Sequence, residues 1–178
     1  MNKKIQLFIG LTCTLCSMLA LANESSNKDF ITAHQFTRLV KKKGVSSIIM
    51  TLSKSPEDGQ WDHVMTGIAS GNDEWLDAVP LVWNTSSEGW NEDLESALGR
   101  AIPHNPRKVM ALLEKTSRLD YMNVCAMPLY NASVPEQNDY VVKSIQGLYK
   151  VDTSMSKKCF DRLIDIVKKS PPFSEDVL

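Results

Sequence analysis

The chain has 178 residues, with 20 basic and 21 acidic side chains and a formal net charge of −1. This balance supplies no excess of positive charge for a phosphate backbone, and one basic run, Lys41 to Lys43, falls at the end of a predicted helix, so we exclude nucleic acid as a partner. A chain of this length can bury a substantial hydrophobic core, and we expect one domain.

The first 22 residues have the pattern of a secretory signal peptide. Lys3 and Lys4 precede an apolar run from Ile5 to Ala22, which ends in the small-residue cleavage site Ala20-Leu21-Ala22. We expect cleavage after Ala22, export to the periplasm and no stable membrane anchor afterwards. A retained anchor is the alternative, and the polar residues within the run disfavour it. Removing Lys3 and Lys4 leaves 18 basic against 21 acidic side chains in the mature chain.

The segment 23–28 is polar, and we expect it to be disordered, with order beginning near Asp29. Four helices are predicted next, because apolar residues recur at helical spacing in four successive segments. These positions are Phe36, Leu39 and Val40; Val45, Ile48, Ile49 and Leu52; Trp61, Val64, Met65 and Ile68; and Trp75, Leu76, Val79, Val82 and Trp83. A capping box at Thr32 and a glycine at Gly44 should bound the first helix, and Pro80 predicts a kink in the fourth. Loops are expected at 53–60 and 85–89.

The segment from Asn91 to Leu113 predicts two amphipathic helices joined by a tight corner. The apolar stripe of the first helix comprises Leu94, Ala97, Leu98, Ala101 and Ile102, and that of the second comprises Val109, Leu112 and Leu113. Pro103 should end the first helix, and Asn105 followed by Pro106 is typical of the cap and first position of the second. We therefore expect an αα-hairpin here.

The last third of the chain should be irregular first and helical afterwards. The segment 116–137 contains two prolines and several asparagines, and only a short stretch around Val124 has strand-like character. Helices follow on two apolar sets: Val141, Ser144, Ile145, Leu148 and Tyr149; and Cys159, Phe160, Leu163, Ile164 and Val167. The prediction is a single helical domain over 29–170 with an acidic tail at 171–178.

The fold class indicated by these patterns is all-α. Short helices with short connections suggest stacked helical hairpins, like HEAT or armadillo arrays by analogy, although no repeat is visible in the residues. Cys125 and Cys159 are the two cysteines that remain after signal removal, so they form a candidate disulfide in an exported chain, worth roughly 3 to 4 kcal/mol. The alternative is two buried free thiols. Neither cysteine has a second Cys or His at ligand spacing, so we predict no metal and no cofactor.

Several short motifs together resemble a group of small exported proteobacterial proteins of unassigned function. They are Ile68-Ala69-Ser70-Gly71; Trp75-Leu76; Leu94 with Ala97-Leu98; Asn105-Pro106 with Val109; and Val124-Cys125 with Pro128. The resemblance covers about Val45 to Pro128 and departs from the group in the polar loop at 53–60. It implies an all-helical periplasmic fold, and it brings no catalytic residues to this chain.

Catalytic motifs are missing from the sequence. No HExxH, GxSxG or P-loop pattern occurs, so we predict a protein that is not an enzyme. His63 is expected to be solvated or half-buried on its helix, whereas His104 lies in an exposed corner between two prolines and is a candidate contact residue. Two clusters of acidic residues could supply the acid and base of a hydrolytic reaction, but the first turns of helices favour Asp and Glu for electrostatic reasons alone. The clusters are Asp73, Glu74 and Asp77; and Glu88, Glu92, Asp93 and Glu95.

Trp90 stands just before the helix predicted from Asn91, away from its apolar stripe, so it either packs as a staple at the helix start or lies exposed as a binding anchor. The candidate binding residues are Trp90, Glu88, Glu92, Asp93, Glu95 and His104. An acidic, aromatic surface suits a basic partner protein. We therefore expect a non-enzymatic periplasmic protein-binding domain, in one version an immunity-type inhibitor of an envelope-targeting toxin. The alternatives are a scaffold or assembly factor of an envelope complex, and an envelope hydrolase whose site forms only in three dimensions.

Overall fold

The computed structural model describes residues 29–54, 59–83, 88–129 and 131–169. These ranges form nine helices and no strand, which confirms the all-α prediction. The helices are α1 (Ala33–Lys43), α2 (Val45–Ser53), α3 (Gln60–Ala69), α4 (Asp73–Val82), α5 (Glu88–Ala101), α6 (Pro106–Glu114), α7 (Tyr121–Val124), α8 (Val134–Val151) and α9 (Ser154–Lys169). The predicted signal peptide, segment 23–28 and tail 171–178 lie outside the described residues. Within the described ranges, no helix combines the length and apolar character that crossing a membrane requires.

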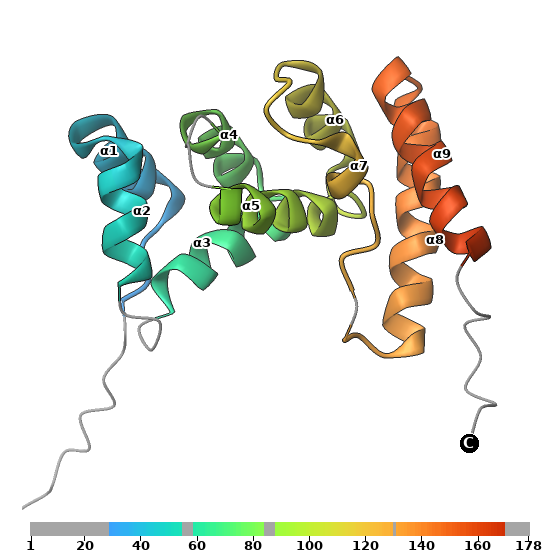
Figure 1. Ribbon diagram of the computed structural model, residues 1–178, viewed down its shortest axis with the longest axis horizontal. Coiled ribbons are helices and arrows are strands. Elements are labelled where there is room, and N and C mark those ends of the chain that lie inside the picture. The colour runs from blue at the N-terminus through green and yellow to red at the C-terminus, as the bar shows by residue number, and fades with distance from the viewer. Residues whose placement is uncertain (1–28, 55–58, 84–87, 130, 170–178) are drawn as a thin grey trace, which may run out of the picture.

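The helices form an arch of neighbouring pairs (Figure 1). The α1–α2 hairpin stands at one end and the α8–α9 hairpin at the other, while α3 and α5 run along the inner side and α4 and α6 along the outer side. α4 packs between α1 and α6, and α3 packs chiefly against α5. One continuous core joins nearly the whole array, as one domain requires; its largest side chains include Phe36, Leu76, Leu98, Met110 and Leu148.

Local capping chemistry explains where several helices begin and end. Thr32 Oγ1 accepts a hydrogen bond from the Gln35 N–H, and the Gln35 side chain accepts one from the Thr32 N–H, so the predicted capping box is present. Gly44 has φ of 83°, a backbone conformation that glycine adopts readily, and it separates α1 from α2. Asn72 caps α4 through its side chain, and α4 continues through Pro80.

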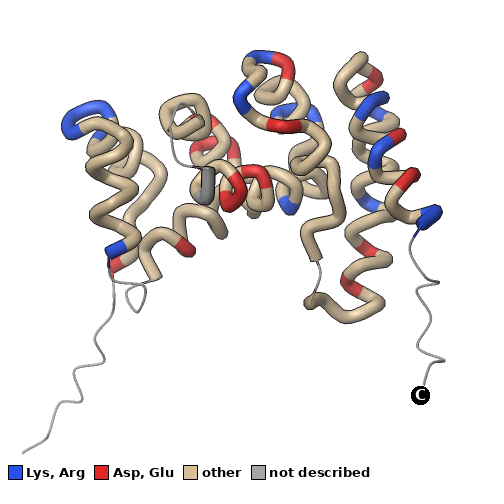
Figure 2. Tube along the Cα trace, in the orientation of Figure 1, with Lys and Arg blue, Asp and Glu red and all other residues tan. Residues whose placement is uncertain are grey.

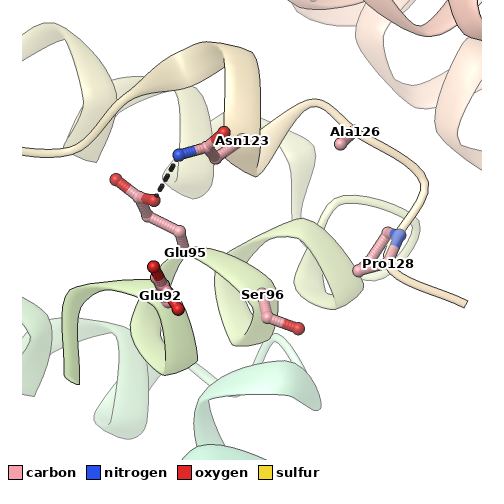
Figure 3. Close-up of a pocket in the computed structure, with 6 residues that line it drawn as sticks. All are labelled: Glu92, Glu95, Ser96, Asn123, Ala126 and Pro128. Carbon is pink, nitrogen blue, oxygen red and sulfur yellow. Dashed lines mark hydrogen bonds between the residues drawn. The ribbon is translucent and has the colours of Figure 1, made fainter. Parts of the chain in front are cut away.

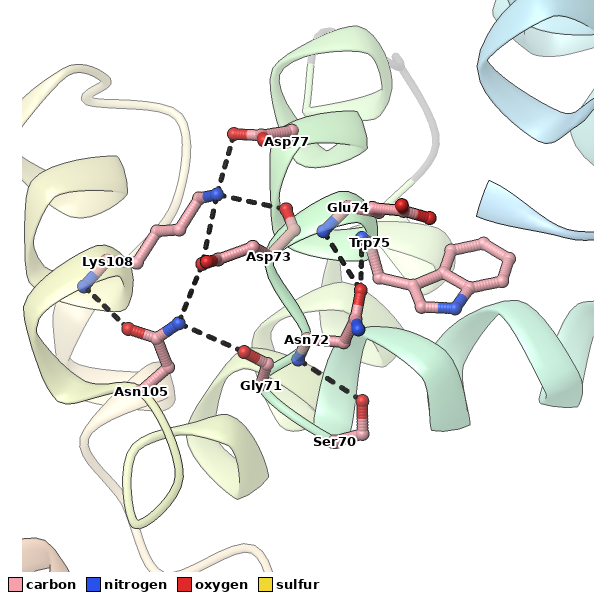
Figure 4. A network of polar contacts seen from close by, with 9 residues as sticks. All are labelled: Ser70, Gly71, Asn72, Asp73, Glu74, Trp75, Asp77, Asn105 and Lys108. Atoms are coloured by element: carbon pink, nitrogen blue, oxygen red, sulfur yellow. Dashed lines mark hydrogen bonds and ion pairs between the residues drawn. The ribbon is translucent and has the colours of Figure 1, made fainter. Parts of the chain in front are cut away.

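A polar network ties the α3–α4 corner to α6 (Figure 4). Asn105 Nδ2 donates to the Gly71 carbonyl and to Asp73 Oδ1, both at 3.0 Å. Lys108 Nζ lies 2.8 Å from Asp77 Oδ1 and 3.2 Å from Asp73 Oδ1. The hydrogen bonds from Lys108 and then Asn105 hold the pKa of Asp73 below its ordinary value. The network therefore fixes the α3–α4 corner and the start of α4 to α6.

The predicted Cys125–Cys159 disulfide is present, and both cysteines are buried. It joins the end of α7 to the middle of α9, across a sequence separation of 34 residues. The irregular connection after α6 is thereby fixed to the terminal hairpin.

Two boundary predictions are wrong. α5 begins at Glu88, so Glu88 and Gly89 are helical and Trp90 lies in the first turn of the helix, not before it. The segment 116–137 is only partly irregular. Asp120 caps the short helix α7, which replaces the strand-like stretch around Val124. α8 begins at Val134, because Ser133 and Glu136 form a capping box.

Tyr149 was expected on a buried helix face, and this prediction is also wrong. Its side chain is 80% exposed, whereas Leu148 is buried beside it. The two residues are adjacent in α8, so they lie about 100° apart around the helix, and only Leu148 faces the core.

Candidate functional site

Residues of α5, which runs along the inner side of the arch, line three hollows of the structure (Figure 1). Its outward-facing residues Glu92, Asp93, Ser96 and Arg100, with Asp62 on the neighbouring helix α3, form what we call the α5 surface. The four residues of α5 follow roughly helical spacing on the side opposite Leu98, which is buried in the core. Ser96 lines two of the hollows and Arg100 lines two, so these adjoin along one helix.

The first hollow lies between α5 and α7 and has a volume of about 340 Å³ (Figure 3). Its residues are Glu92, Glu95, Ser96, Asn123, Ala126 and Pro128. Glu95 is only 6% exposed, and both of its carboxylate oxygens are occupied. Oε1 accepts the Asp120 N–H at 2.7 Å, and Oε2 accepts from Asn123 Nδ2 at 2.9 Å. Glu95 therefore holds α7 against α5, and its predicted role as an exposed contact does not fit this burial.

The second hollow lies between α3 and α5 and has a volume of about 350 Å³. Asp62 on α3 faces it together with Asp93, Ser96 and Arg100 on α5. Trp61 Nε1 donates a hydrogen bond to Asp93 Oδ2 at 2.9 Å, which orients that carboxylate. Trp61 is half-buried and packs against the core, as its helical spacing predicted.

The third hollow, of about 360 Å³, lies where the ends of α3 and α5 meet the start of α8. Arg100 and His104 line it from α5 and the following corner. Tyr140 is buried at its base and donates to the Gly99 carbonyl at 3.0 Å, and burial raises the pKa of its phenol. On α8, Lys143 pairs with Asp139 at 2.7 Å. Arg100 also lines this hollow, and its exposed side chain has no ion-pair partner among the described residues.

Charge changes sign along the α5 surface. Acidic residues lie near the start of α5, and a basic residue lies near its end (Figure 2). Glu92 and Asp93 are exposed at the acidic end, with Asp62 facing the same hollow as Asp93. Arg100 follows Asp93 by seven residues, which is about 10 Å along a helix. Among the described residues, no group of three His, Cys, Asp or Glu side chains could hold a metal ion.

The predicted binding residues separate into three classes in the structure. Glu92, Asp93 and His104 are exposed, and each lines a different hollow around α5. Trp90 is half-buried and is not among the residues that line these hollows. Glu95 is buried, and the side chain of Glu88 lies outside what the structure describes.

Three residues of this surface escaped the sequence prediction: Asp62, Ser96 and Arg100. A signal for the last two was present, because Glu92, Ser96 and Arg100 are spaced four residues apart on the polar side of an amphipathic helix. Nothing in the sequence placed Asp62 opposite them, because that depends on how α3 packs against α5.

Comparison of the chain with protein-family models, with curated proteins and with solved structures gives no match. The resemblance to small exported proteobacterial proteins and the analogy to HEAT or armadillo arrays therefore both stay predictions.

Proposed function

We propose that this protein is a non-enzymatic binding domain of the periplasm and that it holds a partner protein against the α5 surface. The observation that supports this most directly is the convergence of three hollows on one helix at the inner side of the arch. Stacked helical hairpins characteristically use their inner surface to bind extended segments or loops of other proteins.

The charges of the α5 surface define the partner's chemistry. Glu92, Asp93 and Asp62 suit one or more basic side chains, and Arg100 suits a carboxylate about 10 Å further along. The partner segment should therefore carry a basic and an acidic residue at about that separation. Complementary charges of this kind set the register of a bound segment and accelerate its association.

The biological version that we favour is an immunity-type inhibitor of a toxin that attacks the envelope. The predicted signal peptide, the acidic balance of the predicted mature chain and the acidic residues near the start of α5 support it together (Figure 2). A toxin with a basic surface or loop would complement the acidic start of α5. The inhibitor would act by covering the toxin, so it would need no catalytic group of its own.

Capture of the partner by an immobilised, tagged protein from envelope extract tests this proposal. Ser96→Arg should weaken the complex at least tenfold, or about 1.4 kcal/mol, because a long cation would fill the two hollows that Ser96 lines. The matched control is Glu114→Arg, at an exposed position at the end of α6 that is not among the lining residues of these hollows.

A captured toxin whose affinity falls with Ser96→Arg and not with Glu114→Arg supports the inhibitor proposal. A resident envelope protein with the same response would make the protein a scaffold. Equal affinity of the two variants would reject the α5 surface as the binding site.

A further inference from the structure

The end of the array formed by α8 and α9 leaves apolar side chains uncovered. Tyr149 is 80% exposed and Val142 is 53% exposed. They are seven residues apart on α8, so they lie on one side of the helix, two turns from each other. Terminal hairpins of stacked arrays normally present a polar outer face, because no further hairpin covers them. This exposed apolar side of α8 is therefore a candidate protein-binding surface.

A hollow of about 410 Å³ lies directly beside Tyr149, between the end of α8 and the start of α9. Leu148, which is buried, and Phe160, which is half-buried, give it an apolar lining. A protruding aromatic ring and an apolar hollow thus occupy the same small area of surface. Aromatic side chains inserted into apolar pockets are typical anchors of protein interfaces.

The rim of this hollow carries charges of both signs. Lys157 pairs with Asp152 at 2.9 Å, and both side chains are largely exposed. Asp161 lies one turn after Lys157 on α9 and has no ion-pair partner among the described residues. The surface defined by Tyr149, the hollow, Lys157 and Asp161, which we call the terminal surface, therefore contains both halves of an aromatic contact and both halves of an ion pair.

We propose that two copies of this chain form a dimer through their terminal surfaces, related by a two-fold axis. In such an arrangement the same patch is used on both copies, so each element must find its complement within the patch. Tyr149 of each copy enters the hollow of the other. Lys157 of each copy, which already pairs with Asp152 of its own chain, also meets Asp161 of the other copy. A head-to-tail contact would use two different patches and would extend into an open chain, for which this self-complementary surface is not suited.

This dimer does not depend on the proposed partner binding. The terminal surface lies near the C-terminal end of α8, whereas Tyr140, which lines the third hollow near α5, lies in the first half of this helix. A dimer of this kind would leave the three hollows around α5 free and would present two of these sites on one particle.

Sedimentation velocity of the signal-free protein, with its disulfide intact and over a range of concentrations, tests the proposal. We expect a monomer–dimer equilibrium that ends at twice the monomer mass. Tyr149→Glu should weaken dimerisation at least tenfold, and because the side chain is exposed the variant should fold normally. The matched control is Met50→Glu on α2, a 55% exposed apolar side chain at the other end of the array, which should leave dimerisation unchanged.

Charge reversal tests the register of the two copies. Lys157→Glu and Asp161→Lys should each weaken the dimer. Each change turns the contact between positions 157 and 161 of the two copies into a pair of like charges, and the two-fold axis repeats that contact. The double variant should dimerise better than either single variant, since both interchain ion pairs are re-formed with reversed polarity, although Glu at position 157 then faces Asp152 of its own chain. A protein that is monomeric at every concentration, a mass that grows beyond the dimer, or a Tyr149→Glu variant that dimerises like the parent would overturn the proposal.

Discussion

Replacing Glu95 should destabilise the fold directly, because its carboxylate holds α7 against α5. The carboxylate is 6% exposed and accepts two hydrogen bonds, from the Asp120 N–H at 2.7 Å and from Asn123 Nδ2 at 2.9 Å. Hydrogen bonds to a charged group contribute about 1.5–3 kcal/mol each, and both donors here are partly solvated, which reduces their worth. Glu95→Ala should therefore cost about 3 kcal/mol of unfolding free energy.

Glu95→Gln separates the hydrogen bonds from the packing. The amide oxygen of Gln can still accept from the Asp120 N–H, but its NH₂ group would then face the donor of Asn123, so we expect a cost of about 1–2 kcal/mol. Urea unfolding followed by far-ultraviolet circular dichroism, with the disulfide intact, measures both values. If Glu95→Ala changes stability by less than about 0.5 kcal/mol, as an ordinary surface substitution does, the structural role assigned to Glu95 is wrong.

Three further predictions follow from the packing and the charges. Gly67→Ala should lower stability despite the better helix propensity of alanine, because its Cβ would lie 2.6 Å from Nε1 of the Trp75 ring. Urea unfolding followed by tryptophan fluorescence measures the loss of unfolding free energy, and the emission of the folded variant reports displacement of the ring. Reducing the disulfide should cost about 4 kcal/mol through the entropy of its loop, measured as the difference between urea unfolding curves with and without reductant. The lowered pKa of Asp73 means that its ion pair with Lys108 stabilises the fold above the ordinary carboxyl pKa and ceases to do so as the pH falls through the lower folded value. Lys108→Met should therefore reduce the loss of stability below about pH 4, and an unchanged pH profile would contradict this.

The helices from α1 to α6 were predictable because their signals are local. The capping box at Thr32, the glycine at Gly44 and the Asn105-Pro106 pair lie within the segments that they define. The start of α8 had an equally local signal, a serine at 133 with Glu136 three residues later, but the asparagines and prolines around it favoured a loop prediction. The cap, and not the composition of the segment, determines where α8 begins.

The candidate site was only partly predictable, because its shape depends on contacts between distant segments. From the sequence, Glu95 looked like another exposed carboxylate near a helix start. Its burial depends on α7, whose Asp120 lies 25 residues further along the chain. Asp62 likewise joins the α5 surface only through the packing of α3 on α5. Glu92, Asp93 and His104 could be proposed, because polar residues of an amphipathic helix and its corner must face outward.

Site-specific photo-crosslinking in intact cells tests the central claim most directly. A photoreactive amino acid at Ser96 lies within two of the three hollows, and one at Glu114 serves as the exposed control at the end of α6. We predict that illumination links position 96 to one partner protein and that position 114 gives no such product. Equal crosslinking at both positions, or none at position 96 while the partner is still captured by the whole protein, would contradict binding at the α5 surface.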